Sequence, residues 1–175
     1  MRPGGVAPSA WVVSVTEHKR NPGMQRELRV AAPLPGLGLS SATVPDGADV
    51  EAELELEALT DGRIVVTGVV RAPWTGECRR CLEPVTDVVT AEVREVFEPH
   101  PPDGAETYRL DGEQLDLEPM VRDAVLLALP IAPLCATGCA GPDPDAHPVA
   151  VAAEDADDAP PPDPRWSALG DLKFD

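Results

Sequence analysis

A strictly alternating stretch, VEAELELEAL at residues 50–59, constrains the fold more than any other part of this chain. A period of two is typical of a β-strand, because successive side chains of a strand point to opposite faces. The stretch therefore predicts a half-buried strand whose outer face is acidic. A row of glutamates is more often a solvated surface than a site for a cation. The apolar positions expected on the inner face are Val50, Ala52, Leu54, Leu56 and Ala58, and the acidic ones are Glu51, Glu53, Glu55 and Glu57.

Two more long strands are predicted after this one. The sequence TDGR at 60–63 is a turn signal, and IVVTGVVRAPW at 64–74 is the expected antiparallel return. The stretch at 84–99 is again alternating and rich in β-branched residues, which predicts a third strand. A short hairpin is expected further on, around Asp111 and Gly112. The residues that share the inner face of the third strand are Val89, Ala91, Val93 and Phe97.

The hydrophobic period then changes to that of a helix, predicted over residues 117–129. Asp116 is placed to act as the N-cap, Glu118 and Pro119 suit the first turn, and Pro130 and Pro133 end the helix. Long antiparallel strands followed by one main helix indicate an α+β fold with a mostly antiparallel sheet. The helical residues expected to be buried are Leu117, Met120, Val121, Ala124, Val125, Leu127 and Ala128.

The pattern predicts four regions along the chain. Residues 1–10 are expected to be a disordered N-terminus, and residues 11–141 an α+β domain. Residues 142–163 are rich in proline, alanine and aspartate and poor in large apolar side chains, which predicts a disordered acidic linker. Residues 164–175 regain helical signals, with apolar residues at every third position. They are predicted to form a short docking motif, presented by Trp166, Leu169 and Leu172.

The charge of the chain limits its partners. Its 31 acidic and 14 basic side chains give a net charge of −17, which repels polyanions at long range. The cations that remain as candidate contacts to RNA or to a partner are few: Lys19, Arg20, Arg26, Arg29, Arg79 and Arg80. The sequence contains no apolar run of signal-peptide or membrane-span length, so a cytoplasmic protein without membrane contact is expected.

The four cysteines form two closely spaced pairs. Cys78 and Cys81 lie between two predicted strands, and Cys135 and Cys139 follow the predicted helix. Because thiols stay reduced in the cytosol, ligands, catalysts or buried thiols are expected rather than disulfides. Three interpretations remain open: one shared structural zinc, reduced core thiols, or a redox dithiol. Our hypothesis is that the four thiols converge at one end of the sheet.

Two neighbouring features bear on the cysteines. Arg79 and Arg80 are expected to lower the pKa of the first pair of thiols, which favours both the zinc and the redox interpretations. Against redox chemistry, the strand and helix context of a thioredoxin active site is absent from the sequence.

No catalytic constellation emerges from the rest of the sequence. His18, His100 and His147 are expected in exposed loops, and neither a glycine-rich phosphate loop nor a nucleophile elbow is present. A hydrolytic enzyme is therefore disfavoured, and no small-molecule substrate is expected.

Several ordered motifs together resemble the bacterial YceD family, which is named for accumulation of large-subunit ribosomal RNA. They are HKRNPGMQRELRV near the N-terminus, CRRCLEPV, LLALPIAPLC with the following CAG, and DPRWSALGDLKFD at the C-terminus. The resemblance implies a non-enzymatic factor in 23S rRNA maturation or large-subunit assembly. The alternative is a small zinc-binding or thiol-redox module without a ribosomal role.

The chain departs from the family pattern after the second cysteine pair. Many members continue with a further CPxC-like pair, whereas here Asp143 and Ala146 stand where thiols are expected, so a complete metal cluster does not follow from the resemblance. The expected partner is a 23S rRNA precursor, reached through the arginines and Lys19, or a basic large-subunit ribosomal protein, held by the acidic face at 51–57.

Overall fold

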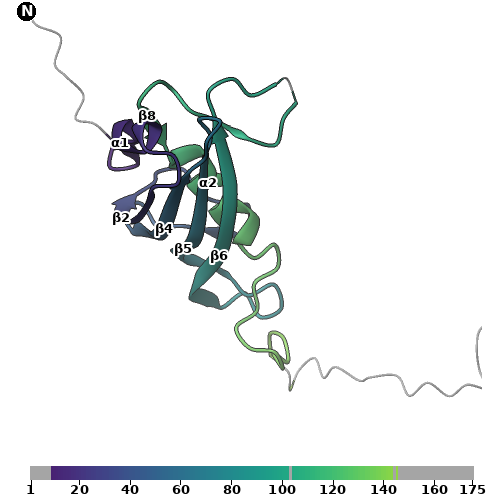
Figure 1. The fold of residues 1–175 in the computed structure, drawn as a ribbon. Coiled ribbons are helices and arrows are strands. Elements are labelled where there is room, and N and C mark those ends of the chain that lie inside the picture. Colours follow the sequence, from purple (N-terminus) through teal and green to yellow (C-terminus); the bar gives the residue numbers. More distant parts are fainter. Residues whose placement is uncertain (1–8, 103, 144, 146–175) are drawn as a thin grey trace, which may run out of the picture. The chain divides into compact units, whose positions relative to one another are not determined.

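The computed structural model describes residues 9–102, 104–143 and 145 (Figure 1). The elements named below all belong to one compact unit, whose described residues are 9–102 and 104–142. The predicted linker, apart from residues 142, 143 and 145, and the docking motif with Trp166, Leu169 and Leu172 lie outside the described residues. No helix of the described part is long and apolar enough to cross a membrane.

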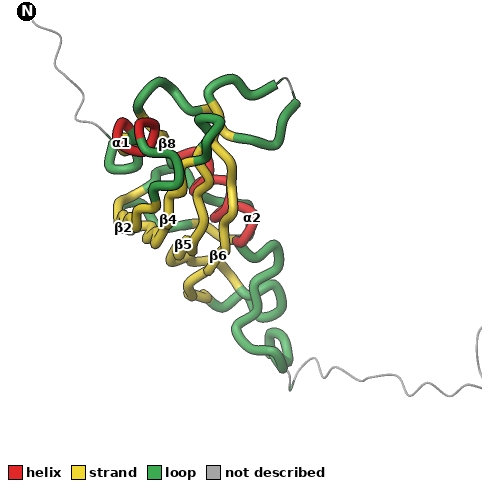
Figure 2. Tube along the Cα trace, in the orientation of Figure 1, coloured by secondary structure: helices red, strands yellow, loops and turns green. Residues whose placement is uncertain are grey.

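A six-stranded sheet forms the body of this unit, and a two-stranded sheet lies beside it (Figures 1 and 2). The central strands run antiparallel in the order β2, β4, β5, β6. At the far edge β7 pairs with β6 in parallel, and β3 pairs with the end of β5. The bounds are β2 Gln25–Pro33, β3 Ala42–Thr43, β4 Asp49–Ala58, β5 Ile64–Glu77, β6 Pro84–Glu98 and β7 Tyr108–Arg109. The smaller sheet consists of β1 Val12–Ser14 and β8 Gln114–Asp116.

The predicted α+β fold is confirmed, and the three long predicted strands are β4, β5 and β6. Every second residue of β4 from Val50 to Ala58 is buried, and the glutamates between them are exposed. Gly68 allows β4 and β5 to approach closely, because a Cβ at this position would lie 2.1 Å from the Glu53 carbonyl oxygen. The alternation seen in the sequence therefore sets both the pairing and the buried face of the sheet.

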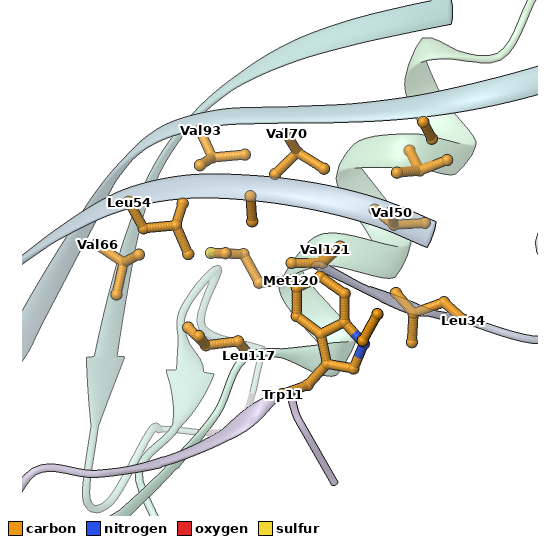
Figure 3. Close-up of a cluster of buried hydrophobic side chains, with 14 of the residues drawn as sticks. Trp11, Leu34, Val50, Leu54, Val66, Val70, Val93, Leu117, Met120 and Val121 are labelled. Atoms are coloured by element: carbon orange, nitrogen blue, oxygen red, sulfur yellow. The ribbon is translucent and has the colours of Figure 1, made fainter. Parts of the chain in front are cut away.

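The main helix α2, Glu118–Ala128, packs against the apolar face of the sheet. Met120, Val121 and Val125 are buried there, and Trp11 from the start of the described chain covers the same core (Figure 3). Burying a large apolar side chain contributes about 1.5–3 kcal/mol each before the cost of ordering is counted. On the opposite face of the sheet the glutamates of β4 are exposed.

Two predictions about the helix ends and faces were wrong. Leu117, rather than Asp116, occupies the N-cap position, and the Asp116 carboxylate accepts a hydrogen bond from the Glu118 backbone N–H at 3.0 Å. Leu127 was expected in the core but is 88% exposed. The core is filled from the side of α2 that carries Met120, Val121 and Val125, and the sheet ends before it covers Leu127.

The predicted hairpin around Asp111 and Gly112 forms only one bridge, between Asp111 and Gln114. Its two arms pair elsewhere, β7 with β6 and β8 with β1, because each is drawn into a longer-range sheet. The turn itself is present, with Gly112 at a φ of 60°.

The expectation of an exposed loop at His18 was also wrong. His18 lies in a short helix, α1 Thr16–Arg20, and is only 1% exposed. Val15 lies three positions earlier and is fully buried, so a single helical turn directs both side chains inward. The Nε2 atom of His18 has no hydrogen-bond partner among the described residues.

Candidate metal centre

The first cysteine pair occupies the turn between β5 and β6, as predicted. Two backbone bonds close the turn: the Cys78 N–H donates to the Glu83 carbonyl, and the Leu82 N–H donates to the Cys78 carbonyl, both at 2.8 Å. Leu82 has a φ of 63°, in the left-handed region that non-glycine residues seldom adopt. The chain reverses within six residues, so Cys78 and Cys81 lie on the same tight turn.

The second pair reaches the same place from the other end of α2. After the helix the chain passes Pro133, whose carbonyl accepts a hydrogen bond from the Arg79 backbone N–H at 2.9 Å. The Arg80 guanidinium donates to the Cys139 carbonyl at 2.8 Å. These two contacts hold the segment with Cys135 and Cys139 against the turn, and the spacing of the cysteines alone did not reveal them.

The four thiols converge, as hypothesised from the sequence. Their Sγ atoms all lie within 4.8 Å of one another. The Cys78 and Cys139 sulfurs are 3.8 Å apart, and those of Cys81 and Cys135 are 3.6 Å apart. Sulfurs bound to one tetrahedral zinc at about 2.3 Å are separated by about 3.8 Å from each other. The four-sulfur donor set therefore fits a structural zinc, without a ligand from the segment that contains Asp143.

The exposure of the thiols differs from one to the next. Cys78 is fully buried, Cys81 and Cys139 are half-buried, and Cys135 is exposed. All four are free thiols, with no disulfide among them. An exposed cysteine contributes little to packing, so Cys135 does not fit the interpretation of four core thiols.

Backbone N–H groups lower the pKa of Cys78, whereas neighbouring thiols raise the pKa of Cys135. The backbone N–H groups of Cys81, Cys135 and Arg80 lower the pKa of Cys78 to about 6. The neighbouring thiols of Cys139, Cys81 and Cys78 raise the pKa of Cys135 to about 12. Four thiolates this close need a cation to balance them.

The expected effect of Arg79 and Arg80 on the first pair is therefore only half right. The pKa of Cys78 is lowered, but backbone N–H groups are the main causes. For Cys81, the Glu83 backbone is the largest single influence and lowers the pKa, but burial and the Cys78 and Cys139 thiols raise it, and the net shift is upward.

The basic residues predicted to contact RNA or a partner fall into two separate groups. Lys19, Arg20 and Arg26 lie at the end of the sheet where β2 starts, with Arg29 further along that strand. Arg79 and Arg80 lie in the cysteine turn at the other end. The 14 residues of β5 separate the two ends by about 40 Å. The structure thus brings the cysteines together but leaves the cations dispersed.

Several of these cations already have partners on the protein. Lys19 donates to the Gly112 carbonyl at 2.7 Å, and Arg29 lies 3.8 Å from the Glu53 carboxylate.

Sequence reasoning did not single out the exposed apolar side chains around α2 and the cysteine turn as functional. They are Leu82, Val88, Leu127, Ile131 and Leu134.

Comparison with known proteins places this geometry in a family. A model described as large ribosomal RNA subunit accumulation protein YceD matches residues 66–173, a range that contains all four cysteines. The chain belongs to the YceD family. The family's description concerns ribosomal RNA and names no catalysed reaction.

The relatives found are mycobacterial proteins. An uncharacterized protein of Mycobacterium tuberculosis strain H37Rv is 35% identical over 173 residues, which cover 94% of this chain and 82% of the relative. An uncharacterized protein of Mycobacterium bovis matches to the same extent. An uncharacterized protein of Mycobacterium leprae is 32% identical over 141 residues, 76% of this chain and 64% of the relative. No solved structure matches the chain.

Proposed function

We propose that this YceD protein is a non-enzymatic ribosome biogenesis factor, acting in the cytoplasm, that supports 23S rRNA accumulation and assembly of the large ribosomal subunit. Membership of a family described by large-subunit ribosomal RNA accumulation is the observation that carries the proposal. A binding role also suits the chemistry of the described part. His18 is buried at the end of the sheet away from the cysteines, so it is not placed to activate one of the thiols.

The four cysteines are proposed to hold one structural zinc. The ion would join the turn that carries Cys78 and Cys81 to the segment that carries Cys135 and Cys139, and so fasten the end of α2 to the sheet. The spacing of the four sulfurs supports this role. The competing function, a zinc or thiol-redox module without a ribosomal role, uses the same cluster and differs in its effect on ribosomes.

The distribution of charge favours a basic ribosomal protein over naked RNA as the direct partner. The outer face of β4 presents Glu51, Glu53, Glu55 and Glu57, and among the described residues Arg29 and Arg71 form ion pairs with Glu53. Phosphates would be repelled by this face, whereas lysines and arginines would be attracted to it. The two cationic groups are also too far apart to form one continuous surface for a nucleic acid.

A deletion strain tests the proposed function. Ribosome profiles and the ratio of 23S to 16S rRNA should show a deficit of large subunits, restored by the full-length chain. Normal profiles and normal 23S rRNA in the deletion strain would contradict the ribosomal role. A variant with Cys81→Ser and Cys135→Ser should restore large subunits less well than the wild-type chain, and full restoration would separate the cysteine cluster from the ribosomal role.

A further inference from the structure

The long strand β6 has an unpaired edge. On one side it pairs with β5 from Pro84 to Glu98, over its whole length. On the other side β7 pairs only with Phe97 and Glu98. Within the residues that the structure describes, no strand pairs with the 84–96 portion of this edge. Such an edge presents backbone N–H and C=O groups that can accept another strand.

Helix α2 extends under this edge and leaves an apolar hollow beside it. The hollow has a volume of about 310 Å³. Its apolar lining includes Ala91 and Val93 of β6 and Ala124, Leu127 and Ala128 of α2. Leu127 is 88% exposed because the sheet stops short of it. A strand added to β6 would lie above this part of α2, and its inward side chains would cover Leu127.

The rim of the hollow is acidic. Glu92, Glu95 and Asp123 line it, and the adjoining hollow shares Glu95 and Asp123 and adds Glu106. Arg94 is the one cation among the residues that line the two hollows. A segment that fits this place must therefore combine apolar side chains at every second position with lysines or arginines between or beside them.

We propose that the β6 edge at 84–96 binds an extended, basic segment of a large-subunit ribosomal protein by strand addition, with its alternate apolar side chains in the hollow between β6 and α2. The inference rests on the proposed function and names the surface and the kind of segment that it uses. Backbone hydrogen bonds would supply affinity, and the hollow would select the apolar side chains.

Other occupants fit less well. A second copy of the chain would bring one acidic rim against another, and RNA would bring phosphates against the same carboxylates. Among the described strands β2 also has an unpaired edge, but it carries Arg26 and Arg29, which would repel a basic segment. Glu95 lies on the same face of β6 as Val93 and Phe97, so its charge points inward. If no partner binds this edge, such a charge serves only to prevent unwanted strand pairing. The experiment below separates that protective role from binding.

Two short peptides provide the probe: one alternates lysine and valine, and the other has the same composition with the lysines and valines in two blocks. The full-length protein should bind the alternating peptide about tenfold more tightly, since only that peptide buries valines in the hollow. Leu127→Lys should abolish the difference. Leu82→Lys is the matched control, because Leu82 is 67% exposed near the cysteines and the charge change is the same. On binding, amide hydrogen exchange should slow along 84–96.

Each contrary result overturns the proposal. Strand addition at this edge would be excluded if the protein bound the two peptides with equal affinity. It would also be excluded if Leu127→Lys and Leu82→Lys lost the same affinity for the alternating peptide, or if amide hydrogen exchange did not slow in β6. A self-association that Leu127→Lys abolishes would assign the edge to a second copy, and tighter binding of single-stranded RNA than of the peptides at this edge would assign it to RNA. In the deletion strain, full rescue by Leu127→Lys would refute the edge alone, whereas the absence of any large-subunit defect would refute the proposed function.

Discussion

Removing zinc should lower the stability of this protein by an amount that follows from the separation of its two cysteine pairs. A metal that binds both pairs closes a loop, and Cys81 and Cys135 are 54 positions apart. By the chain-entropy relation for cross-links, closing a loop of this length is worth about 4 kcal/mol. The total free energy of unfolding of a domain is about 5–15 kcal/mol, so loss of the metal should remove a large part of it.

Substitution at Cys135 gives the sharpest form of the test. This side chain is exposed, so Cys135→Ser should change the free energy of unfolding by less than about 0.5 kcal/mol if the thiol only touches solvent. If Cys135 is a zinc ligand, the substitution should cost a substantial part of the loop-closure energy. The midpoint of thermal unfolding would then fall by about 10 °C for a chain of this size. Cys78→Ser cannot discriminate, since Cys78 is fully buried and its packing is lost in either case.

The assay combines metal analysis with thermal unfolding. Protein purified without added zinc or chelator should carry close to one zinc per chain, because four thiolates are complete ligands for one ion. A strong chelator should lower the midpoint of the wild-type protein and leave that of Cys135→Ser much less changed. A metal content near zero, four titratable thiols and a midpoint that neither the chelator nor Cys135→Ser alters would refute the zinc interpretation.

Three further predictions follow from the structure and the sequence. Burial, and then the charge of Arg26, lower the pKa of His18 below 6.5, so the folded state binds fewer protons than the unfolded state. The free energy of unfolding should therefore fall as the pH drops below 6.5 towards the lowered pKa, by at most about 1.4 kcal/mol per pH unit. In denaturant titrations at several pH values, His18→Gln should remove this contribution to the pH dependence of the unfolding free energy. Gly68→Ala should destabilise the β4–β5 pair by more than about 2 kcal/mol, measured by chemical unfolding, because its Cβ would overlap the Glu53 carbonyl; a neutral result would refute the close approach. Trp166→Ala should weaken partner capture or lower the thermal midpoint if residues 164–175 dock, and a variant unchanged in both would show that Trp166 contributes to neither.

The strands were predictable where one local pattern decides both pairing and burial. The alternation in β4 and the turn signal after it determine the β4–β5 hairpin with no information from the rest of the chain. The strand β2 was missed, although Leu28, Val30 and Ala32 alternate with charged or small residues and Ala32 is buried. Its partner is β4, with paired residues 16 to 32 positions apart in the chain, and the neighbouring arginines made the segment resemble a basic surface.

The cysteine site was predictable in composition but not in construction. Two closely spaced pairs suffice for four ligands, and the turn between two strands fixes the first pair. The approach of the second pair depends on Pro133 accepting from the Arg79 backbone and on Arg80 donating to the Cys139 carbonyl. These contacts join segments more than 50 residues apart, and nothing in the local spacing of either pair encodes them.

Leu127 shows why the helix pattern could predict the element and still misplace one of its faces. The period of 3.6 groups Leu127 with apolar neighbours of α2, but burial also requires a sheet wide enough to cover that side of the helix. The sheet ends at β6, since β7 continues it for only two residues. Helical periodicity predicts that Leu127 is buried, but the tertiary structure leaves it 88% exposed. Leu127 therefore marks the place where an added strand would complete the sheet. The same incomplete edge thus accounts for both the failed burial prediction and the proposed binding surface.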